Sequence, residues 1–135
     1  MLSSLDRYAP YALTALRIVA ALLFMEHGTV KLFGFPEVEG HGAGGGSLPP
    51  LMLVAGILEV FGGLAILIGL FTRPIAFLLS GQMAVAYWMA HYKPDAFYPI
   101  QNGGDGSILF CFVFLYLFFA GPGAWAVDNL WKRNG

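Results

Sequence analysis

The sequence has few charged residues. Only 11% of its 135 residues are Asp, Glu, Lys or Arg, whereas 58% are hydrophobic and 16% are aromatic. A soluble domain carries about 25% charged residues, which help to cover its surface with groups that water solvates. This chain has too few such residues for that, so its composition predicts an integral membrane protein.

An excess of basic residues and a second cysteine are also missing. The formal net charge is -1, which leaves no basic patch for nucleic acid. The single cysteine, Cys111, excludes an internal disulfide and the CxxC pairs found in redox and zinc sites. The sequence therefore argues against nucleic-acid binding and dithiol chemistry, and we expect Cys111 to be a small core residue.

Long hydrophobic runs, in contrast, are abundant. Four stretches have the roughly 20 residues, or about 30 Å of helix, that a membrane span needs. They cover residues 11–33, 50–71, 74–92 and 104–121. The runs are continuous instead of alternating, which favours helices over strands. The sequence predicts an all-α, integral membrane four-helix antiparallel bundle, formed by a single domain over residues 1–135.

The basic residues near the ends of these runs predict the orientation. Cytoplasmic flanks of membrane helices carry an excess of Lys and Arg, and four of these residues lie on the side of both termini. We therefore expect both termini to be cytoplasmic and the protein to lie in a bacterial inner (plasma) membrane. The four are Arg7, Arg73, Lys132 and Arg133, against Lys31 and Lys93 on the opposite, outer side.

This topology gathers most of the polar chemistry at the outer membrane face. The first run ends there with the sequence "FMEHGTVKLFGF", the third ends there with "HY", and the fourth begins there. One interpretation is that these polar residues form a site. The other is that they only meet water and headgroups at helix ends. The residues concerned are Glu26, His27, Lys31, His41, His91, Tyr98, Asn102 and Asp105.

Two charges lie well inside the apolar runs, Arg17 in the first and Glu59 in the second. A charge within a membrane costs about 2.5–3.5 kcal/mol on insertion scales, so it normally faces other helices and finds a partner. Gly56 and Gly63 share a helical face with Glu59 and would allow another helix to approach closely. We therefore predict a buried Arg17–Glu59 ion pair, formed directly or through one further polar group, either as a structural clasp or with a role in a proton relay or in substrate binding.

Three segments together resemble a known family. They are "HGTVKLFGF" after an arginine-bearing first helix, "GILEVFGGLAILIGLFTRPIA", and "FCFVFLYLFFAGPGAWAVD". From about Arg17 to Asp128 the chain resembles the DoxX family of small four-helix membrane proteins, DoxD-like relatives included. Members are associated with quinone-linked oxidoreduction, so the resemblance implies a membrane oxidoreductase subunit that works with quinone.

The outer residues suit a quinone headgroup. Such a headgroup needs a hydrogen-bond donor at each carbonyl, and groups that exchange protons when it is reduced. Apolar walls around it would come from the aromatic side chains of the fourth run and of the loop before it, residues 92–106, which is called the third loop below. The expected catalytic residues are His27, Lys31, His91, Glu26 and Asp105, and the expected headgroup-binding residues are Asn102 and Tyr98.

Other functions stay open at this point. His27 and His91 end different helices at a similar depth, which would suit two axial ligands of a haem, or a metal site completed by Glu26 or Asp105. No local metal-binding motif supports that alternative. A non-enzymatic membrane transporter, lipid-handling or complex-assembly protein is the competing class. The expected partners are the lipid bilayer, other membrane or redox subunits and, in a homo-oligomer, further copies of the chain.

Overall fold

The computed structural model describes residues 2–39 and 48–132, and every regular element in these ranges is a helix. The all-α prediction is therefore confirmed for this part of the chain. His41 and Arg133, which the sequence analysis assigned to the outer loops and to the basic tail, lie outside the described residues.

The first helical run begins with a short 3-10 helix, η1 (Leu2–Tyr8), and continues as α1 (Ala9–Phe33). Proline in the first turn of α1 suits its start, where a missing N–H costs little. The helix ends at Gly34, whose left-handed φ of 67° turns the chain while its N–H donates to the carbonyl of Val30. With 25 residues, α1 is about 37 Å long.

The second helical run consists of three elements in direct succession. These are α2 (Pro50–Ile57), the π-helical turn η2 (Leu58–Gly62) and α3 (Gly63–Ile68). The run ends at Gly69, again in the left-handed region with a φ of 72°. Glu59 lies in the π-helical turn, where the chain is wound more loosely than in an α-helix.

The remaining elements are α4 (Thr72–Ala86), the π-helical turn η3 (Tyr87–His91), α5 (Pro99–Asn102), α6 (Asp105–Ala120) and α7 (Asp128–Lys132). The short connection before α4 is held by Asp128, whose carboxylate accepts hydrogen bonds from the backbone N–H groups of Phe71 and Thr72. The segment after α6, residues 121–132, is called the tail below. Through Asp128 it caps the start of the third helical run.

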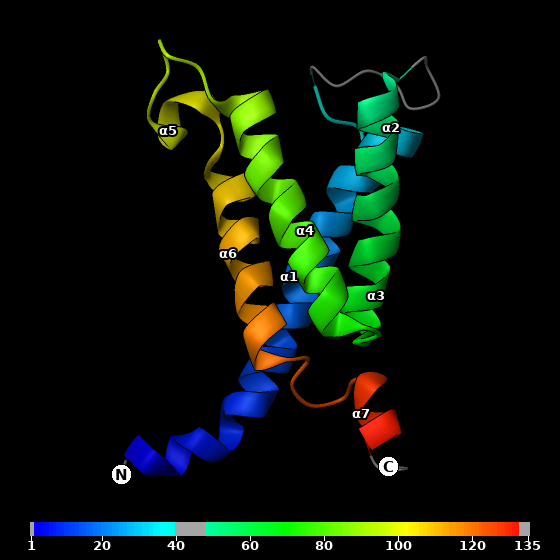
Figure 1. Cartoon of the computed structure of the whole chain (residues 1–135), viewed down its shortest axis with the longest axis vertical. Helices are drawn as coiled ribbons and strands as arrows, with labels where there is room; N and C mark the ends of the chain where they lie inside the picture. The colour runs from blue at the N-terminus through cyan, green and yellow to red at the C-terminus, as the bar shows by residue number, and fades with distance from the viewer. Residues whose placement is uncertain (1, 40–47, 133–135) are drawn as a thin grey trace.

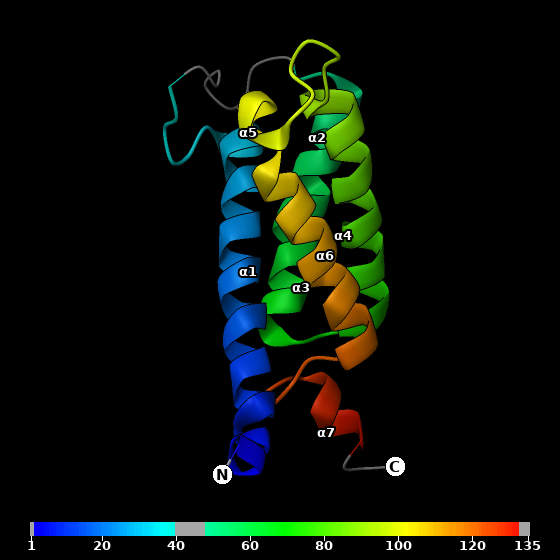
Figure 2. The same cartoon turned by 90° about the vertical axis from the view of Figure 1, so that its left-hand side faces the viewer.

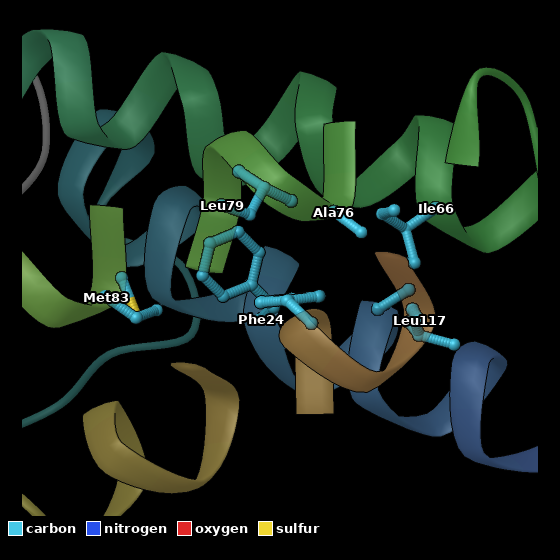
Figure 3. Close-up of a cluster of buried hydrophobic side chains, with 8 residues drawn as sticks. Phe24, Ile66, Ala76, Leu79, Met83 and Leu117 are labelled. Atoms are coloured by element: carbon cyan, nitrogen blue, oxygen red, sulfur yellow. The ribbon is translucent and has the colours of Figure 1, made fainter. Parts of the chain in front are cut away.

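The helical runs lie side by side, with the N-terminal segment and α7 at one end and α5 and the start of α2 at the other (Figures 1 and 2). Within this arrangement, α1 packs mainly against the α2–η2–α3 run, and α4 packs mainly against α6. The core joins these two pairs with fully buried side chains, among them Phe24, Ile66, Leu79 and Leu117 (Figure 3). The Phe24 and Phe114 rings meet edge to face at 4.9 Å.

Two of the helical runs have both the length and the apolar composition of a membrane span, Ser3–Phe33 and Pro50–Ile68. The apolar helix α6 has 16 residues, which correspond to about 24 Å, shorter than the roughly 30 Å of a hydrocarbon core. The α4–η3 run does not meet the same criterion among the described residues. Length and composition alone therefore identify two spans of the four predicted.

Candidate functional site

A buried ion pair joins α1 to the second helical run. The ammonium nitrogen of Lys31 lies 2.9 Å from both carboxylate oxygens of Glu59. The Glu59 side chain is only 4% exposed, whereas that of Lys31 is 21% exposed. The lysine therefore brings its charge from the C-terminal end of α1 into the space between the helices, and neutralises a carboxylate that water hardly reaches.

The glycines around Glu59 explain why the two helices come so close. A Cβ atom added at Gly28 would lie 2.8 Å from the Cβ of Glu59 and 2.8 Å from the carbonyl oxygen of Gly56. A Cβ atom added at Gly63 would lie 2.3 Å from the side chain of Met25. The expectation that small residues bring a neighbouring helix close to Glu59 is confirmed, and that helix is α1.

The predicted Arg17–Glu59 ion pair is wrong, because each residue has a different partner. Arg17 is 1% exposed and donates to backbone carbonyls of the segment after α6. Its guanidinium nitrogens lie 3.0 Å from the carbonyl oxygen of Trp125 and 3.3 Å from that of Ala124. It also donates to Pro122 and, weakly, to Leu67. A guanidinium has five N–H groups, and several carbonyls satisfy more of them than one carboxylate does.

Apart from the carbonyl of Leu67 in α3, the carbonyls that surround Arg17 belong to the segment after α6, which was not predicted to contact α1. Gly121 and Gly123 both have left-handed φ values, 83° and 77°, and these turns bring residues 122–125 back beneath α1. Thr14 holds the same segment, since its hydroxyl donates to Ala124 at 2.6 Å. The "GPG" sequence was the available signal for a turn, but backbone acceptors leave no trace in side-chain identity.

His27 lies one helical turn before Lys31, beside the ion pair. Its Nδ1 is 2.7 Å from the carbonyl oxygen of Leu23, and because a carbonyl only accepts, Nδ1 carries the proton in the neutral ring. The Nε2 atom is then the acceptor. The ring packs edge to face on Phe110 of α6, with the ring centroids 5.7 Å apart.

His91 belongs to a second group, which organises the third loop. Its Nδ1 is 3.3 Å from the backbone oxygen of Asn102. The amide of Asn102 donates to the carbonyl of Ala96 at 3.0 Å and to the hydroxyl of Tyr87 at 3.3 Å, and its oxygen accepts from the N–H of Gly104. Asn102 thereby fixes the turn that leads into α6.

The other predicted site residues, Glu26, Tyr98 and Asp105, are exposed. The Tyr98 ring packs edge to face on Phe97 at 5.5 Å. Among the contacts within residues 2–39 and 48–132, none joins His27 or Lys31 to His91. The same ranges contain no group of three His, Cys, Asp or Glu side chains arranged to hold a metal ion. A single cavity shared by all of these residues stays a prediction.

Comparisons with known proteins agree with the family resemblance found in the sequence. A family model described as DoxX matches residues 12–92. A Haemophilus influenzae protein described as "Uncharacterized protein" is 45% identical over 130 residues, which cover 95% of this chain and 96% of the relative.

Two Escherichia coli proteins are also similar. Inner membrane protein YqjF is 31% identical over 87% of this chain and 90% of its own length. Inner membrane protein YphA is 29% identical over 89% of this chain and 90% of its own length. No solved structure matches the chain.

Proposed function

Because the chain belongs to the DoxX family, we propose that it is an integral inner-membrane protein of four antiparallel helices that binds a quinone headgroup beside the Lys31–Glu59 pair. In this proposal it serves as the quinone-binding, proton-handling subunit of a membrane oxidoreductase. The redox centre that exchanges electrons with the quinone belongs to a partner subunit.

Several features support the membrane location. The two Escherichia coli relatives are named as inner membrane proteins. Large apolar side chains such as Leu22, Leu64 and Phe112 are between 43% and 62% exposed, which suits contact with lipid better than contact with water. Arg7, Arg73 and Lys132 accompany η1, α4 and α7, and their excess supports cytoplasmic termini.

The observation that carries the functional proposal is the combination of a buried ion pair with a histidine of defined tautomer. Lys31 has three N–H groups, and its contacts with the two Glu59 oxygens leave one for a quinone carbonyl. The Nε2 atom of His27 accepts a hydrogen bond from a quinol hydroxyl. One donor and one acceptor side by side on α1 therefore match the two redox forms of a quinone headgroup.

The proposed division of work between the residues follows from their burial. A bound quinone supplies the two-electron redox chemistry. His27, which is exposed, takes up or returns a proton at Nε2. Glu59 stays paired and holds Lys31 in position, so that the lysine keeps its charge and its remaining donor beside the headgroup.

Quinone binding tests the proposal. We expect His27→Gln to weaken the binding of a ubiquinone or menaquinone analogue about tenfold in lipid nanodiscs, since one hydrogen bond and one proton acceptor at Nε2 are lost. Glu37→Gln is the control, because Glu37 is exposed beyond the end of α1 and belongs to none of the predicted site residues, so it should leave binding unchanged.

His91→Gln separates the small site from the larger predicted one. If His91→Gln weakens quinone binding as much as His27→Gln does, the site extends to the third loop. If both histidine variants bind as tightly as the parent protein, quinone binding at this site is wrong. The non-enzymatic class, a transporter, lipid-handling or assembly protein, would then be favoured.

A further inference from the structure

An open pocket lies at the opposite end of the molecule from the ion pair. It measures about 490 Å³, which falls within the range of about 300–1,000 Å³ that is common for small-molecule sites. Its walls come from η1, the first turns of α1, the start of α4, the end of α6 and α7, which meet at the lower end of Figure 1. Segments distant in the sequence thus build it together.

The pocket contains two basic side chains, Arg73 and Lys132. Arg73 is held in place because its Nη1 donates to the last carbonyls of α6, at 2.9 Å to Phe118 and 2.6 Å to Phe119. These bonds use the two N–H groups of Nη1, so three of the five guanidinium N–H groups remain for another acceptor. An arginine oriented in this way suits the paired oxygens of a phosphate group.

The same pocket has a carboxylate, Asp6, and a lining of which about half is apolar. The apolar lining includes Ala9, Leu13, Ala120 and Pro122. A simple anion would gain from the two bases but would be repelled by Asp6. A headgroup that carries both a phosphate and an ammonium group complements all three charges, and its acyl chains suit the apolar wall.

We propose that this pocket binds phosphatidylethanolamine, with its phosphate on Arg73 and Lys132 and its primary ammonium on Asp6. Primary ammonium N–H groups donate hydrogen bonds to a carboxylate, whereas the methylated ammonium of phosphatidylcholine has no N–H to donate. The ligand enters sideways from the inner leaflet, since the pocket is open and its walls are the ends of the membrane helices.

Exposed aromatic side chains place this end at headgroup level. Tyr8, Tyr11, Trp125 and Trp131 are all at least 49% exposed, and Tyr11 packs against Trp125 with ring centroids 5.4 Å apart. Tyrosine and tryptophan favour the interface between hydrocarbon and headgroups. The pocket is therefore at the depth at which a phospholipid phosphate resides.

Lipid retention by the full-length protein tests the basic residues. The protein is released from nanodiscs that contain equal parts of phosphatidylethanolamine, phosphatidylcholine and phosphatidylglycerol, and its bound lipids are identified by native mass spectrometry. We expect the parent protein to retain phosphatidylethanolamine preferentially, and Lys132→Gln to reduce that retention about fivefold. Lys93→Gln is the control, since Lys93 is exposed in the third loop at the other end.

The role of Asp6 is tested by selectivity instead of affinity. We expect Asp6→Asn to abolish the preference for phosphatidylethanolamine over phosphatidylcholine, and to increase retention of phosphatidylglycerol. Equal retention of all three lipids by the parent protein, or an unchanged preference in Asp6→Asn, would overturn the proposal.

The lipid must also be distinguished from a soluble phosphate compound. Glycerophosphoethanolamine, which has the headgroup without acyl chains, should compete only weakly for the site. If it displaces the lipid completely at equal concentration, the pocket binds a soluble ligand and the proposal is wrong. These measurements do not involve quinone, so their outcome is independent of the function proposed above.

Discussion

Burial of a single carboxylate determines much of the behaviour of this protein at the level of residues. Glu59 is 4% exposed in an apolar run, and an intramembrane charge costs about 2.5–3.5 kcal/mol on insertion scales. Lys31 offsets that cost, and its own side chain is less buried, at 21% exposed. The Glu59 carboxylate thus depends more on Lys31 as a partner than the Lys31 ammonium depends on Glu59.

This asymmetry predicts the result of a double-mutant cycle. Lys31→Met leaves the Glu59 carboxylate buried without its partner, and we expect a loss of roughly 3–5 kcal/mol in the free energy of unfolding. Glu59→Gln should cost less, because the Lys31 side chain can extend towards headgroups and water. The combined variant should lose less than the sum of the two single losses, as measured by denaturant unfolding in detergent. Additive losses would show that the residues do not interact.

Arg17 makes a different prediction, because its partners are backbone carbonyls of the tail. Arg17→Met leaves the carbonyls of Pro122, Ala124 and Trp125 without this donor, and each buried unsatisfied group costs about 1–3 kcal/mol. We expect the tail to separate from the helices, so that the amides of Val127 and Asp128 lose protection in hydrogen exchange.

The control for this experiment is the Lys31→Met variant, in which those two amides should keep their protection. Arg17→Lys should give an intermediate result, since an ammonium has three donors where a guanidinium has five. Unchanged exchange at Val127 and Asp128 in Arg17→Met would contradict the role of Arg17 in holding the tail.

Among the elements, the two π-helical turns coincide with the two polar groups. Glu59 lies in η2, and His91 closes η3, beside Asn102. Such turns occur frequently at functional sites, because the looser winding changes the direction of the side chains on one face. This placement fits the assignment of the Lys31–Glu59 pair as the centre of the candidate site.

Close packing of α1 on the second helical run predicts opposite effects for two glycine substitutions. Gly28→Ala would place a Cβ atom 2.8 Å from atoms of Gly56, Glu59 and Val60, and such overpacking costs typically about 1–3 kcal/mol. Gly81→Ala meets nothing within 4 Å, so helix propensity alone should stabilise it by roughly 0.5–1 kcal/mol. Thermal unfolding of the two variants in the same detergent checks this, and equal shifts would contradict the packing argument.

Sequence reasoning was most successful where one-dimensional patterns determine structure. The helix α1 (Ala9–Phe33) and the helical runs 50–68, 72–91 and 105–120 differ from the expected ranges by at most three residues at any boundary, because apolar runs and turn residues specify where helices begin and end. The 3-10 helix η1, which extends the first run to Leu2, was not predicted. The partner of Glu59 was predicted wrongly. Both Arg17 and Lys31 lie on the first helix, and only the fold of the tail shows that Arg17 is already satisfied.

The molecule as a whole separates its chemistry between two ends. The last turns of α1, which carry His27 and Lys31, lie towards the end that includes α5, whereas α7 and the start of α4, which carries Arg73, lie at the other end (Figures 1 and 2). Hydrogen bonds close that second end, because Asp128 of α7 caps α4, and Arg73 of α4 donates to the last carbonyls of α6. The proposed quinone and phospholipid sites therefore lie at opposite ends of the helical runs.

This separation gives a prediction about topology. Ser3 and Asp95 are both exposed and lie at opposite ends of the helical runs. We introduce Ser3→Cys and Asp95→Cys separately, with Cys111→Ala as the background, and label intact bacterial cells with a membrane-impermeant maleimide.

The basic flanks favour cytoplasmic termini, so we expect labelling of Asp95→Cys in intact cells and labelling of Ser3→Cys only after the inner membrane is opened. The Cys111→Ala background protein, verified to be in the membrane, serves as the unlabelled control. The odd number of helical runs between Ser3 and Asp95, namely α1, α2–α3 and α4–η3, requires opposite sides, and labelling of both from one side would therefore overturn the four-helix arrangement.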